Sequence, residues 1–324
     1  MAKKKILIPQ PLHADGMALL TARKDVDLVV LDSSTEAALV PAARDVHAIV
    51  VRTARIDRAV IGAAPLLEIV SRHGVGYDAI DVEALNARRI PLALAIHSNM
   101  VSVAEHVMFM LLTLVKEGAA YDAMTRSGDW RGRVAPMATD LAGKNLLVVG
   151  FGRTGSRVAQ RALAFDMKVH VSDPFIDQAL ISKAGCVPVP DLRKALPQMD
   201  AVSTNCPLSE ATRHLFSSAE FDLMKPTAVI VNCARGGILD EAALHAALSS
   251  RRIRAAGLDV FDTEPTPTDN PLLSLPNLIV SPHIAGVTQE AMVRMSTQSA
   301  QNVLDHFDGK LDPDTVVNRA EIAA

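Results

Sequence analysis

The sequence predicts an α/β protein with two domains. Short β-type runs alternate with helical stretches along the chain, which is typical of βαβ units with parallel sheets. A glycine-rich turn follows an apolar run near the middle of the chain. The length of 324 residues exceeds the roughly 250–300 at which a single hydrophobic core stops growing.

Five short apolar runs in the first third of the chain predict the strands of a first sheet. These runs are Lys5–Ile8, Val26–Leu31, Ala48–Val51, Glu68–Arg72 and Pro91–Ala95. Helical stretches such as His13–Arg23 and Asp57–Ala64 separate them, so we expect a parallel sheet.

A long apolar helix is expected to open the second domain. Ser102, Val103, Ala104 and Glu105 have the pattern of a capping box, and the apolar positions continue to Lys116. The polar segment Ala119–Gly143 is then expected to be a connector.

Six further apolar runs predict the sheet of the second domain. They are Asn145–Val149, Lys168–Ser172, Ala201–Thr204, Ala228–Asn232, Ala255–Asp259 and Leu278–Val280. Six strands suit a doubly wound sheet. A last helix, Thr288–Phe307, is expected to return to the first domain and leave a cleft between the two. The expected domains are therefore residues 1–97 with 288–324, and residues 98–287.

Charge and hydropathy exclude two classes of partner. The net charge is −3 and there is no basic block beyond Lys3–Lys5, so we expect no nucleic-acid binding. The longest apolar stretch, Val107–Val115, is far shorter than the run of about 20 residues that crosses a bilayer. Ile6–Ile8 is too short for the apolar core of a signal peptide, so we expect a cytoplasmic protein without membrane association.

The chain contains three cysteines, Cys186, Cys206 and Cys233, and no CxxC pair. Their spacing is not that of a metal site, so we expect free thiols in a reducing compartment and no bound metal.

Gly150, Gly152 and Gly155 form a GxGxxG turn between a predicted strand and a predicted helix. In that context glycines permit a tight turn, close approach of the backbone to a pyrophosphate, and close helix packing. A glycine turn in some other α/β fold is the alternative. Asp173 ends the next strand, where a carboxylate binds ribose hydroxyls and repels a 2′-phosphate, which favours NAD over NADP. A simple Asp173-Pro174 turn is the alternative for that residue.

Six blocks in the same order carry a more specific signal than the glycine turn. They are Ser71 to Asp78, Ser102 to His106, Asn205 to Pro207, Asn232 to Gly237, Asp259 to Pro265 and Ser281 to Gly286. With the glycine turn, these blocks resemble the D-isomer-specific 2-hydroxyacid dehydrogenases. The resemblance implies a doubly wound NAD-binding Rossmann domain and a flavodoxin-like substrate domain.

The resemblance implies three catalytic residues. Arg235 is expected to bind the carboxylate and carbonyl of the substrate, because a planar guanidinium matches paired oxygens. His283 is expected to donate a proton to the carbonyl oxygen, and Glu264 to orient the imidazole and stabilise its protonated form. The alternatives are a structural arginine at a strand end, an ordinary loop histidine and a solvated carboxylate.

The resemblance also implies the residues that bind the cofactor, NAD. Arg153 and Thr154 are assigned to the pyrophosphate turn, Asp173 to the ribose and Asp259 to the nicotinamide carboxamide. Five other residues complete this set: Pro207 near the adenosine, Thr212 and Cys233 in the cleft wall, and Ala234 and Gly286. Cys233 as a core thiol and Thr212 as a helix cap are the structural alternatives.

For the substrate, the resemblance implies a loop of Gly74, Val75 and Gly76 whose backbone amides approach the carboxylate. A plain tight turn is the alternative. Some phosphoglycerate dehydrogenases place an arginine near the substrate phosphate at the position of Arg52, although surface arginines are common. Ala95-Ile96-His97 replaces the Thr-Pro-Gly of many relatives, so the hinge is expected to have a different shape.

The expected function is NAD-dependent interconversion of a small 2-oxo acid and its (R)-2-hydroxy acid, as in hydroxypyruvate or glyoxylate reductases and phosphoglycerate dehydrogenases. An NADH-sensing protein similar to the corepressor branch of the family is one alternative. A formate dehydrogenase is another, although those relatives carry Gln where Glu264 stands. The apolar surface of Ser102–Lys116 predicts a homodimer.

Overall fold

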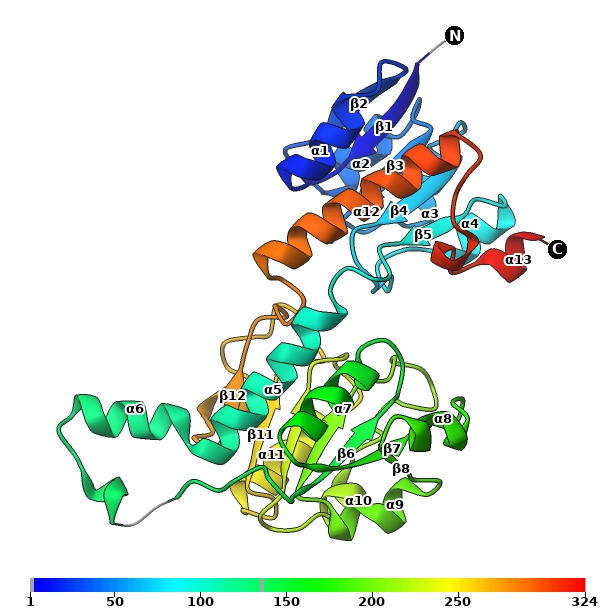
Figure 1. Ribbon diagram of the computed structural model, residues 1–324. Helices are drawn as coiled ribbons and strands as arrows, with labels where there is room; N and C mark the ends of the chain where they lie inside the picture. The colour runs from blue at the N-terminus through cyan, green and yellow to red at the C-terminus, as the bar shows by residue number, and fades with distance from the viewer. Residues whose placement is uncertain (1–2, 135–136, 324) are drawn as a thin grey trace. The chain divides into compact units, whose positions relative to one another are not determined.

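The computed structural model describes residues 3–134 and 137–323 (Figure 1). The chain divides into two compact units. Unit 1 comprises Met1–Asn99 and Val287–Ala324, and unit 2 comprises Met100–Gly286. Residues 135 and 136 of the expected connector lie outside the described residues.

Unit 1 is built on a parallel sheet of five strands in the order β2-β1-β3-β4-β5. The strands are β1 (Lys4–Ile8), β2 (Val26–Val30), β3 (Ala48–Val51), β4 (Ile69–Arg72) and β5 (Leu92–Leu94). This is the flavodoxin-like strand order. Each strand agrees with its predicted range to within one residue at either end, because buried parallel strands are continuous apolar runs.

Helices cover both faces of this sheet. They are α1 (Ala14–Thr21), α2 (Glu36–Ala42), α3 (Arg58–Gly62), α4 (Val82–Ala87), α12 (Gln289–Phe307) and α13 (Arg319–Ala323), with a 3-10 turn η4 (Pro313–Thr315). Helices α2, α3 and α4 pack on one face, and α1 and α12 on the other. Helix α1 approaches α12 so closely that a Cβ atom on Gly16 would lie 2.3 Å from the hydroxyl of Ser296.

Unit 2 is built on a parallel sheet of seven strands in the order β12-β11-β10-β9-β6-β7-β8. The strands are β6 (Asn145–Val149), β7 (Lys168–Ser172), β8 (Val187–Pro188), β9 (Ala201–Thr204), β10 (Val229–Asn232), β11 (Ala255–Leu258) and β12 (Leu278–Val280). The predicted doubly wound sheet is confirmed, but the expected number of six strands was wrong. Strand β8 was missed because two residues at a sheet edge, one of them proline, carry no alternation of apolar residues.

Strand β6 pairs with both β7 and β9, so the order of strands reverses at β6. Its side chains alternate between two apolar clusters: Leu146 and Val148 pack under α5 and α7, and Leu147 and Val149 pack under α10 and α11. In open α/β sheets the carboxyl end of the strand at such a reversal is where ligands bind.

The helices of unit 2 are α5 (Met100–Lys116), α6 (Gly118–Arg126), α7 (Gly155–Ala164), α8 (Gln178–Lys183), α9 (Leu192–Ala195), α10 (Ser218–Phe221) and α11 (Glu241–Ser249). Short 3-10 turns are η1 (Arg131–Arg133), η2 (Leu196–Gln198) and η3 (Pro271–Ser274). Within residues 3–134 and 137–323, no helix has both the length and the apolarity needed to traverse a lipid bilayer.

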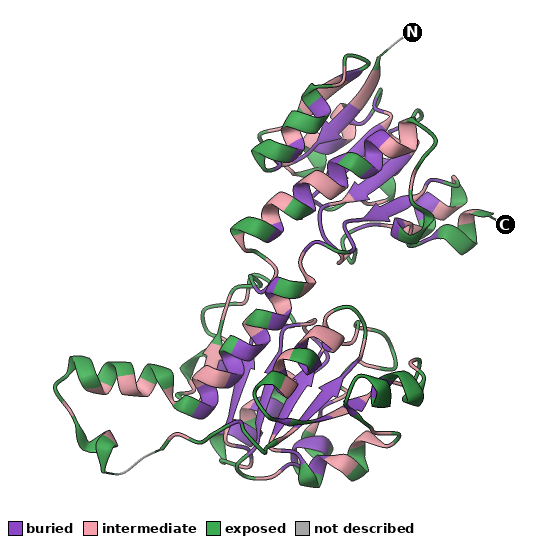
Figure 2. Ribbon diagram, in the orientation of Figure 1, coloured by how far each residue is buried: buried purple, intermediate pink, exposed green. Residues whose placement is uncertain are grey.

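The structure corrects two expectations about the start of unit 2. Helix α5 begins at Met100, so Ser102 is buried within its first turn and is not its cap. Glu105 forms an ion pair with Arg161 of α7 at 3.0 Å, so its carboxylate does not close a capping box. The expected connector contains helix α6, which has no buried residue and therefore lacks the apolar periodicity that predicts a helix (Figure 2).

Candidate active site

The three glycines of the turn between β6 and α7 have different surroundings. Gly150 has φ +89°, and a Cβ atom there would lie 2.8 Å from the backbone nitrogen of Cys206. A Cβ atom on Gly155 would lie 1.9 Å from the carbonyl oxygen of Gly150, whereas a Cβ atom on Gly152 would meet nothing within 4 Å. Two glycines are therefore required by packing, and the backbone at Gly152 is open to a ligand. This pattern fits the pyrophosphate of a dinucleotide.

The start of helix α7 adds favourable electrostatics to this turn. Thr154 is the N-cap residue, and its side chain makes no capping hydrogen bond. Arg153 beside it is exposed. Free amides and the positive end of a helix dipole attract phosphate groups.

Asp173, directly after β7, lies against the glycine turn. Its Oδ2 accepts a hydrogen bond of 2.7 Å from the amide of Phe151, and its Oδ1 accepts one of 2.9 Å from the amide of Phe175. An ionised carboxylate has about four lone-pair positions, so Asp173 retains acceptor capacity for ribose hydroxyls after these two bonds.

Arg235, Glu264 and His283 follow β10, β11 and β12, which are neighbours in the sheet. Nδ1 of His283 lies 2.6 Å from Oε2 of Glu264, and Oε1 of Glu264 accepts a hydrogen bond of 2.9 Å from the amide of Phe261. An ionised carboxylate only accepts hydrogen bonds, so Nδ1 carries the hydrogen and Nε2 is the outer nitrogen. The His283 side chain is 49% exposed, which leaves Nε2 accessible to a reactant.

Glu264 remains ionised in this arrangement. Burial raises its pKa, but the hydrogen bonds from His283 and Phe261 and the charges of His283 and Arg235 lower it by more, so the net shift is downward. The arginine thus acts electrostatically on the same carboxylate that holds the histidine.

Arg235 is half-buried, and its backbone is fixed by its neighbours. Its carbonyl accepts a hydrogen bond of 2.8 Å from the side chain of Asn232, and its guanidinium donates one of 2.7 Å to the carbonyl of Ala234. A Cβ atom on the next residue, Gly236, would lie 1.9 Å from the carbonyl oxygen of Phe261. Glycine therefore lets the loop after β10 pack directly on the loop after β11.

His283 has a left-handed backbone with φ +54°, which is rare for a residue other than glycine. Three consecutive amides, those of His283, Ile284 and Ala285, donate to the carbonyl oxygen, Oδ1 and Oδ2 of Asp259 at 2.7, 2.9 and 2.8 Å. Asp259 thus fixes the loop that carries His283. The sequence motifs named Asp259 but gave no indication of this role.

Four other residues named from the sequence belong to unit 2, and two of them have clear structural roles. The Thr212 hydroxyl accepts from the amide of Ser209 and donates to the carbonyl of Pro207, which fixes a turn. Cys233 is buried in the core under α5, and burial and the charge of Asp259 raise the pKa of its thiol. Ala234 and Gly286 are partly exposed.

In unit 1, Arg52 and Gly74–Gly76 follow the neighbouring strands β3 and β4. Gly74 has φ +123°, a conformation that requires glycine, and Nε of Arg72 donates to the carbonyl of Gly76 at 2.7 Å. Arg52 donates to the carbonyl of Pro11 at 2.9 Å. The carboxyl ends of two adjacent strands therefore bring these residues to one edge of the sheet.

His73, the first residue of the segment that resembles the substrate loop, is the buried neighbour of Gly74. It is 4% exposed, and its Nε2 has no hydrogen-bond partner within the described part of the chain. Burial, and then the charges of Arg52 and Arg72, lower its pKa to about 4. The imidazole is therefore neutral at pH 7.

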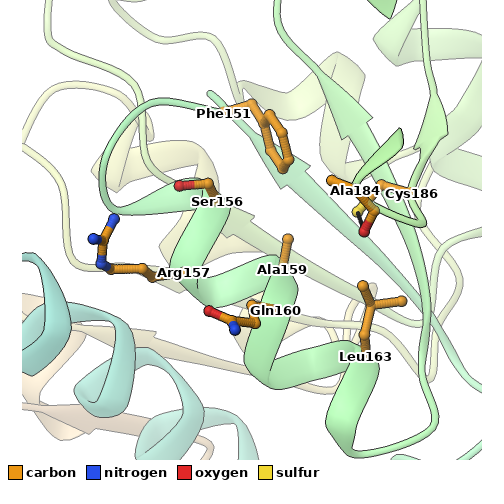
Figure 3. A pocket seen from close by; sticks show the side chains of 8 residues that line it. All are labelled: Phe151, Ser156, Arg157, Ala159, Gln160, Leu163, Ala184 and Cys186. Carbon is orange, nitrogen blue, oxygen red and sulfur yellow. Dashed lines mark hydrogen bonds between the residues drawn. The ribbon is translucent and has the colours of Figure 1, made fainter. Parts of the chain in front are cut away.

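A pocket of about 440 Å³ lies beside α7 (Figure 3). It is lined by Phe151, Ser156, Arg157, Ala159, Gln160, Leu163, Ala184 and Cys186. It shares Phe151 with the glycine turn but includes none of Arg235, Glu264 and His283. Among the residues that the structure describes, no group of three or more His, Cys, Asp or Glu side chains has the arrangement of a metal site.

The fold and the glycine turn together define a two-unit α/β protein with a dinucleotide site. Residues 108–285 match the family model of the D-isomer specific 2-hydroxyacid dehydrogenase NAD binding domain. The chain therefore belongs to the D-isomer-specific 2-hydroxyacid dehydrogenase family, as its motifs predicted, and these residues belong to its NAD-binding domain.

Two curated relatives of similar identity carry different activity names. The chain is 38% identical over 98% of its length to a D-3-phosphoglycerate dehydrogenase of Methanocaldococcus jannaschii, of which it covers 60%. It thus spans about three fifths of the length of that relative. It is also 38% identical to glyoxylate/hydroxypyruvate reductase B of Klebsiella pneumoniae, with 81% of this chain and 82% of the relative covered.

A solved relative has the same fold over nearly its whole length. The D-lactate dehydrogenase of Aquifex aeolicus, in complex with NAD and lactic acid, superposes with a TM-score of 0.87. The two chains are 27% identical, and the match covers 97% of this chain and 99% of the other. The predicted fold class is thereby confirmed.

Proposed function

We propose that this protein catalyses the NAD-dependent interconversion of a small 2-oxo acid and its (R)-2-hydroxy acid. Hydroxypyruvate, glyoxylate and phosphohydroxypyruvate are the candidate 2-oxo acids. The observation that carries the proposal is the pair of His283 and Glu264 at 2.6 Å, on the loops of the sheet that also bears the glycine turn. The names of the relatives support the same reaction class.

In this proposal NADH supplies the hydride for reduction and NAD accepts it for oxidation. Arg235 binds the carboxylate and carbonyl oxygens through its guanidinium, which orients the carbonyl carbon. Nε2 of His283 donates a proton to the carbonyl oxygen during reduction and removes it during oxidation. Glu264 holds the imidazole through Nδ1 and stabilises its protonated form.

The cofactor is held by residues of unit 2. Gly150, Gly152 and Gly155, with Arg153 and Thr154, bind the pyrophosphate. The remaining contacts are Asp173 to the ribose, Pro207 near the adenosine and Asp259 to the nicotinamide carboxamide. Thr212 and Cys233 belong to the cleft wall, and Ala234 and Gly286 complete the set. The open backbone at Gly152 and the spare acceptor capacity of Asp173 support this assignment.

We assign the substrate domain to residues 1–97 with 288–324, and the NAD-binding domain to residues 98–287. In the substrate domain, the amides of Gly74, Val75 and Gly76 bind the substrate carboxylate, and Arg52 lies near a phosphate where the substrate has one. The positive φ of Gly74 supports this role, because glycine leaves room for backbone amides to approach a bound anion.

We also propose that the protein is a cytoplasmic homodimer joined through α5 and α6. Phe109 on α5 is 57% exposed, Trp130 and Val134 after α6 are 63% and 86% exposed, and α6 buries no side chain within its own unit. Light scattering is expected to give about twice the chain mass of 34.6 kDa. Phe109→Asp and Val134→Asp are expected to shift the protein to the monomer, and a monomeric wild type would contradict the dimer.

Oxidation of NADH with a panel of 2-oxo acids tests the proposed reaction. We expect turnover with hydroxypyruvate, glyoxylate, pyruvate or phosphohydroxypyruvate, monitored at 340 nm. His283→Ala is expected to lower kcat by about 10²–10⁴, the usual contribution of general acid catalysis, with NADH binding unchanged. NADH binding without turnover of any member of the panel would refute the proposal.

A further inference from the structure

A partly buried series of hydrogen bonds connects helix α5 with the loop that carries His283. Nε2 of His106, on α5, lies 2.9 Å from the hydroxyl oxygen of Ser281, directly after β12. The hydroxyl of Ser281 donates in turn to Oδ1 of Asp259, which is 1% exposed. Because the hydrogen of the hydroxyl is used by the carboxylate, Nε2 of His106 is the donor to Ser281.

This series of hydrogen bonds ends at the backbone of His283, the proposed proton donor. Asp259 receives the three consecutive amides of His283, Ile284 and Ala285, which hold His283 at φ +54°. A left-handed conformation at a residue with a side chain persists only where its surroundings impose it. The Asp259 carbonyl and carboxylate therefore fix the backbone of this loop, and Glu264 holds the imidazole itself through Nδ1.

One acceptor position of the Asp259 carboxylate receives no hydrogen bond within the described part of the chain. Oδ1 accepts from Ser281 and from the amide of Ile284, and Oδ2 accepts from the amide of Ala285. These bonds use three of the about four lone-pair positions of the carboxylate. The remaining position is on Oδ2, where the proposed function places the nicotinamide carboxamide.

We propose that His106 and Ser281 are positioning residues for hydride transfer. By fixing Oδ1 of Asp259, they orient Oδ2 toward the nicotinamide carboxamide and hold the His283 loop in its left-handed conformation. This inference rests on the proposed function for its activity test and has a separate binding test.

Activity is measured for His106→Ala and His106→Gln. Loss of the donor in His106→Ala is expected to lower kcat about tenfold, since a small displacement of reacting groups can cost up to about 100-fold. The Nε2 of glutamine occupies the position of the imidazole Nε2 and donates, so His106→Gln is expected to retain kcat to within about threefold, since it keeps the same hydrogen bond.

A kinetic isotope effect separates positioning from loss of folded protein. With NADH deuterated at the transferred position, His106→Ala is expected to show a larger isotope effect on kcat than the wild type, because hydride transfer becomes slower relative to other steps. A smaller fraction of active protein lowers kcat equally with NADH and with deuterated NADH, so the isotope effect does not change. His170→Ala is the matched control, because His170 is a half-buried histidine whose Nε2 lies 3.2 Å from Oδ1 of Asn145 outside this chain of bonds.

The binding test uses NADH and ADP-ribose, which lacks nicotinamide. His106→Ala and Ser281→Ala are each expected to weaken NADH binding several-fold and to leave ADP-ribose binding unchanged. The double variant His106→Ala/Ser281→Ala is expected to lose no more NADH affinity than the weaker-binding single variant, because both residues act through Asp259.

The inference would be overturned if the single variants bound NADH and ADP-ribose equally more weakly, or if NADH binding were unchanged. Additive losses of NADH affinity in the double variant would also overturn it. An inactive wild type that binds NADH refutes the proposed function alone, and the binding test still decides the role of His106 and Ser281. A wild type that binds no NADH overturns both.

Discussion

Gly155 packs so closely on Gly150 that a Cβ atom at residue 155 would overlap the carbonyl oxygen of residue 150, at 1.9 Å. Gly152, between them in the chain, has no atom within 4 Å of its own Cβ position. Replacing Gly155 with alanine is therefore expected to affect stability, whereas replacing Gly152 with alanine is expected to affect cofactor binding.

Gly155→Ala is expected to destabilise unit 2 by about 1–3 kcal/mol or more, because the backbone must move to relieve the overlap. Gly152→Ala is expected to change the free energy of unfolding by less than about 0.5 kcal/mol and to weaken NADH binding at least about tenfold, which corresponds to about 1.4 kcal/mol. Urea unfolding and NADH titration measure the two effects. Tight NADH binding by Gly152→Ala would exclude this turn as the pyrophosphate site.

Asp173→Asn keeps the side-chain shape and one acceptor oxygen but removes the negative charge of the proposed ribose contact. We expect NADH to bind more weakly and NADPH to bind more tightly. The preference for NADH, measured as the ratio of the kcat/KM values for the two cofactors, is therefore expected to fall about 10–100-fold. Asp177→Asn is a control, since Asp177 caps α8 through its side chain. An unchanged preference in Asp173→Asn would remove Asp173 from the ribose site.

Glu264→Gln tests the pairing with His283. The amide keeps an oxygen for Nδ1 but loses the charge that stabilises a protonated imidazole, so kcat for reduction is expected to fall about 10–100-fold. The pH–rate profile for reduction is expected to differ from that of the wild type, because the partner of Nδ1 no longer carries a charge. A pH–rate profile identical to that of the wild type would show that the carboxylate charge has no part in the reaction.

His73 is expected to make unit 1 sensitive to acid. Its pKa is lowered from 6.5 to about 4 in the folded chain, so between these values the unfolded chain binds a proton that the folded chain does not. Stability from this group is fully present above pH 6.5 and is lost as the pH falls toward 4, by about 3 kcal/mol in total.

The measurement is the free energy of unfolding at several pH values between 7.5 and 4. In His73→Gln the free energy of unfolding is expected to fall by about 3 kcal/mol less over this pH range than in the wild type, whatever the stability of the variant at pH 7.5. His97→Gln, at an exposed position, is the control and is expected to follow the wild type. A decline of equal slope in His73→Gln would show that another group causes it.

Much of the fold could be predicted from the sequence, because strands of parallel sheets buried on both faces are continuous apolar runs. Strands such as β3 (Ala48–Val51) and β9 (Ala201–Thr204) match their predicted ranges. The features that were missed lack such a signal. Strand β8 has two residues, α6 has no buried face, and the first turn of α5 contains a Ser-x-x-Glu pattern that does not cap it.

The proposed site was predictable where a motif names a residue, and not where its contacts depend on tertiary structure. The pairing of Glu264 with His283 was expected from the resemblance, and the distance of 2.6 Å agrees with it. The link from His106 through Ser281 to Asp259 joins residues up to 175 positions apart, and only the sheet and its covering helix bring them together. The desolvation of His73 likewise depends on packing that no local pattern reports.

The left-handed backbone of His283 bears on the selection that acts on this loop. A glycine at residue 283 would relieve about 1–2 kcal/mol of unfavourable conformation, but it would add about 0.4–1 kcal/mol of conformational entropy to the unfolded chain and remove the contact with Glu264. His283→Gly is therefore expected to leave stability nearly unchanged while it removes the proposed proton donor, so selection for turnover alone keeps histidine in this left-handed position.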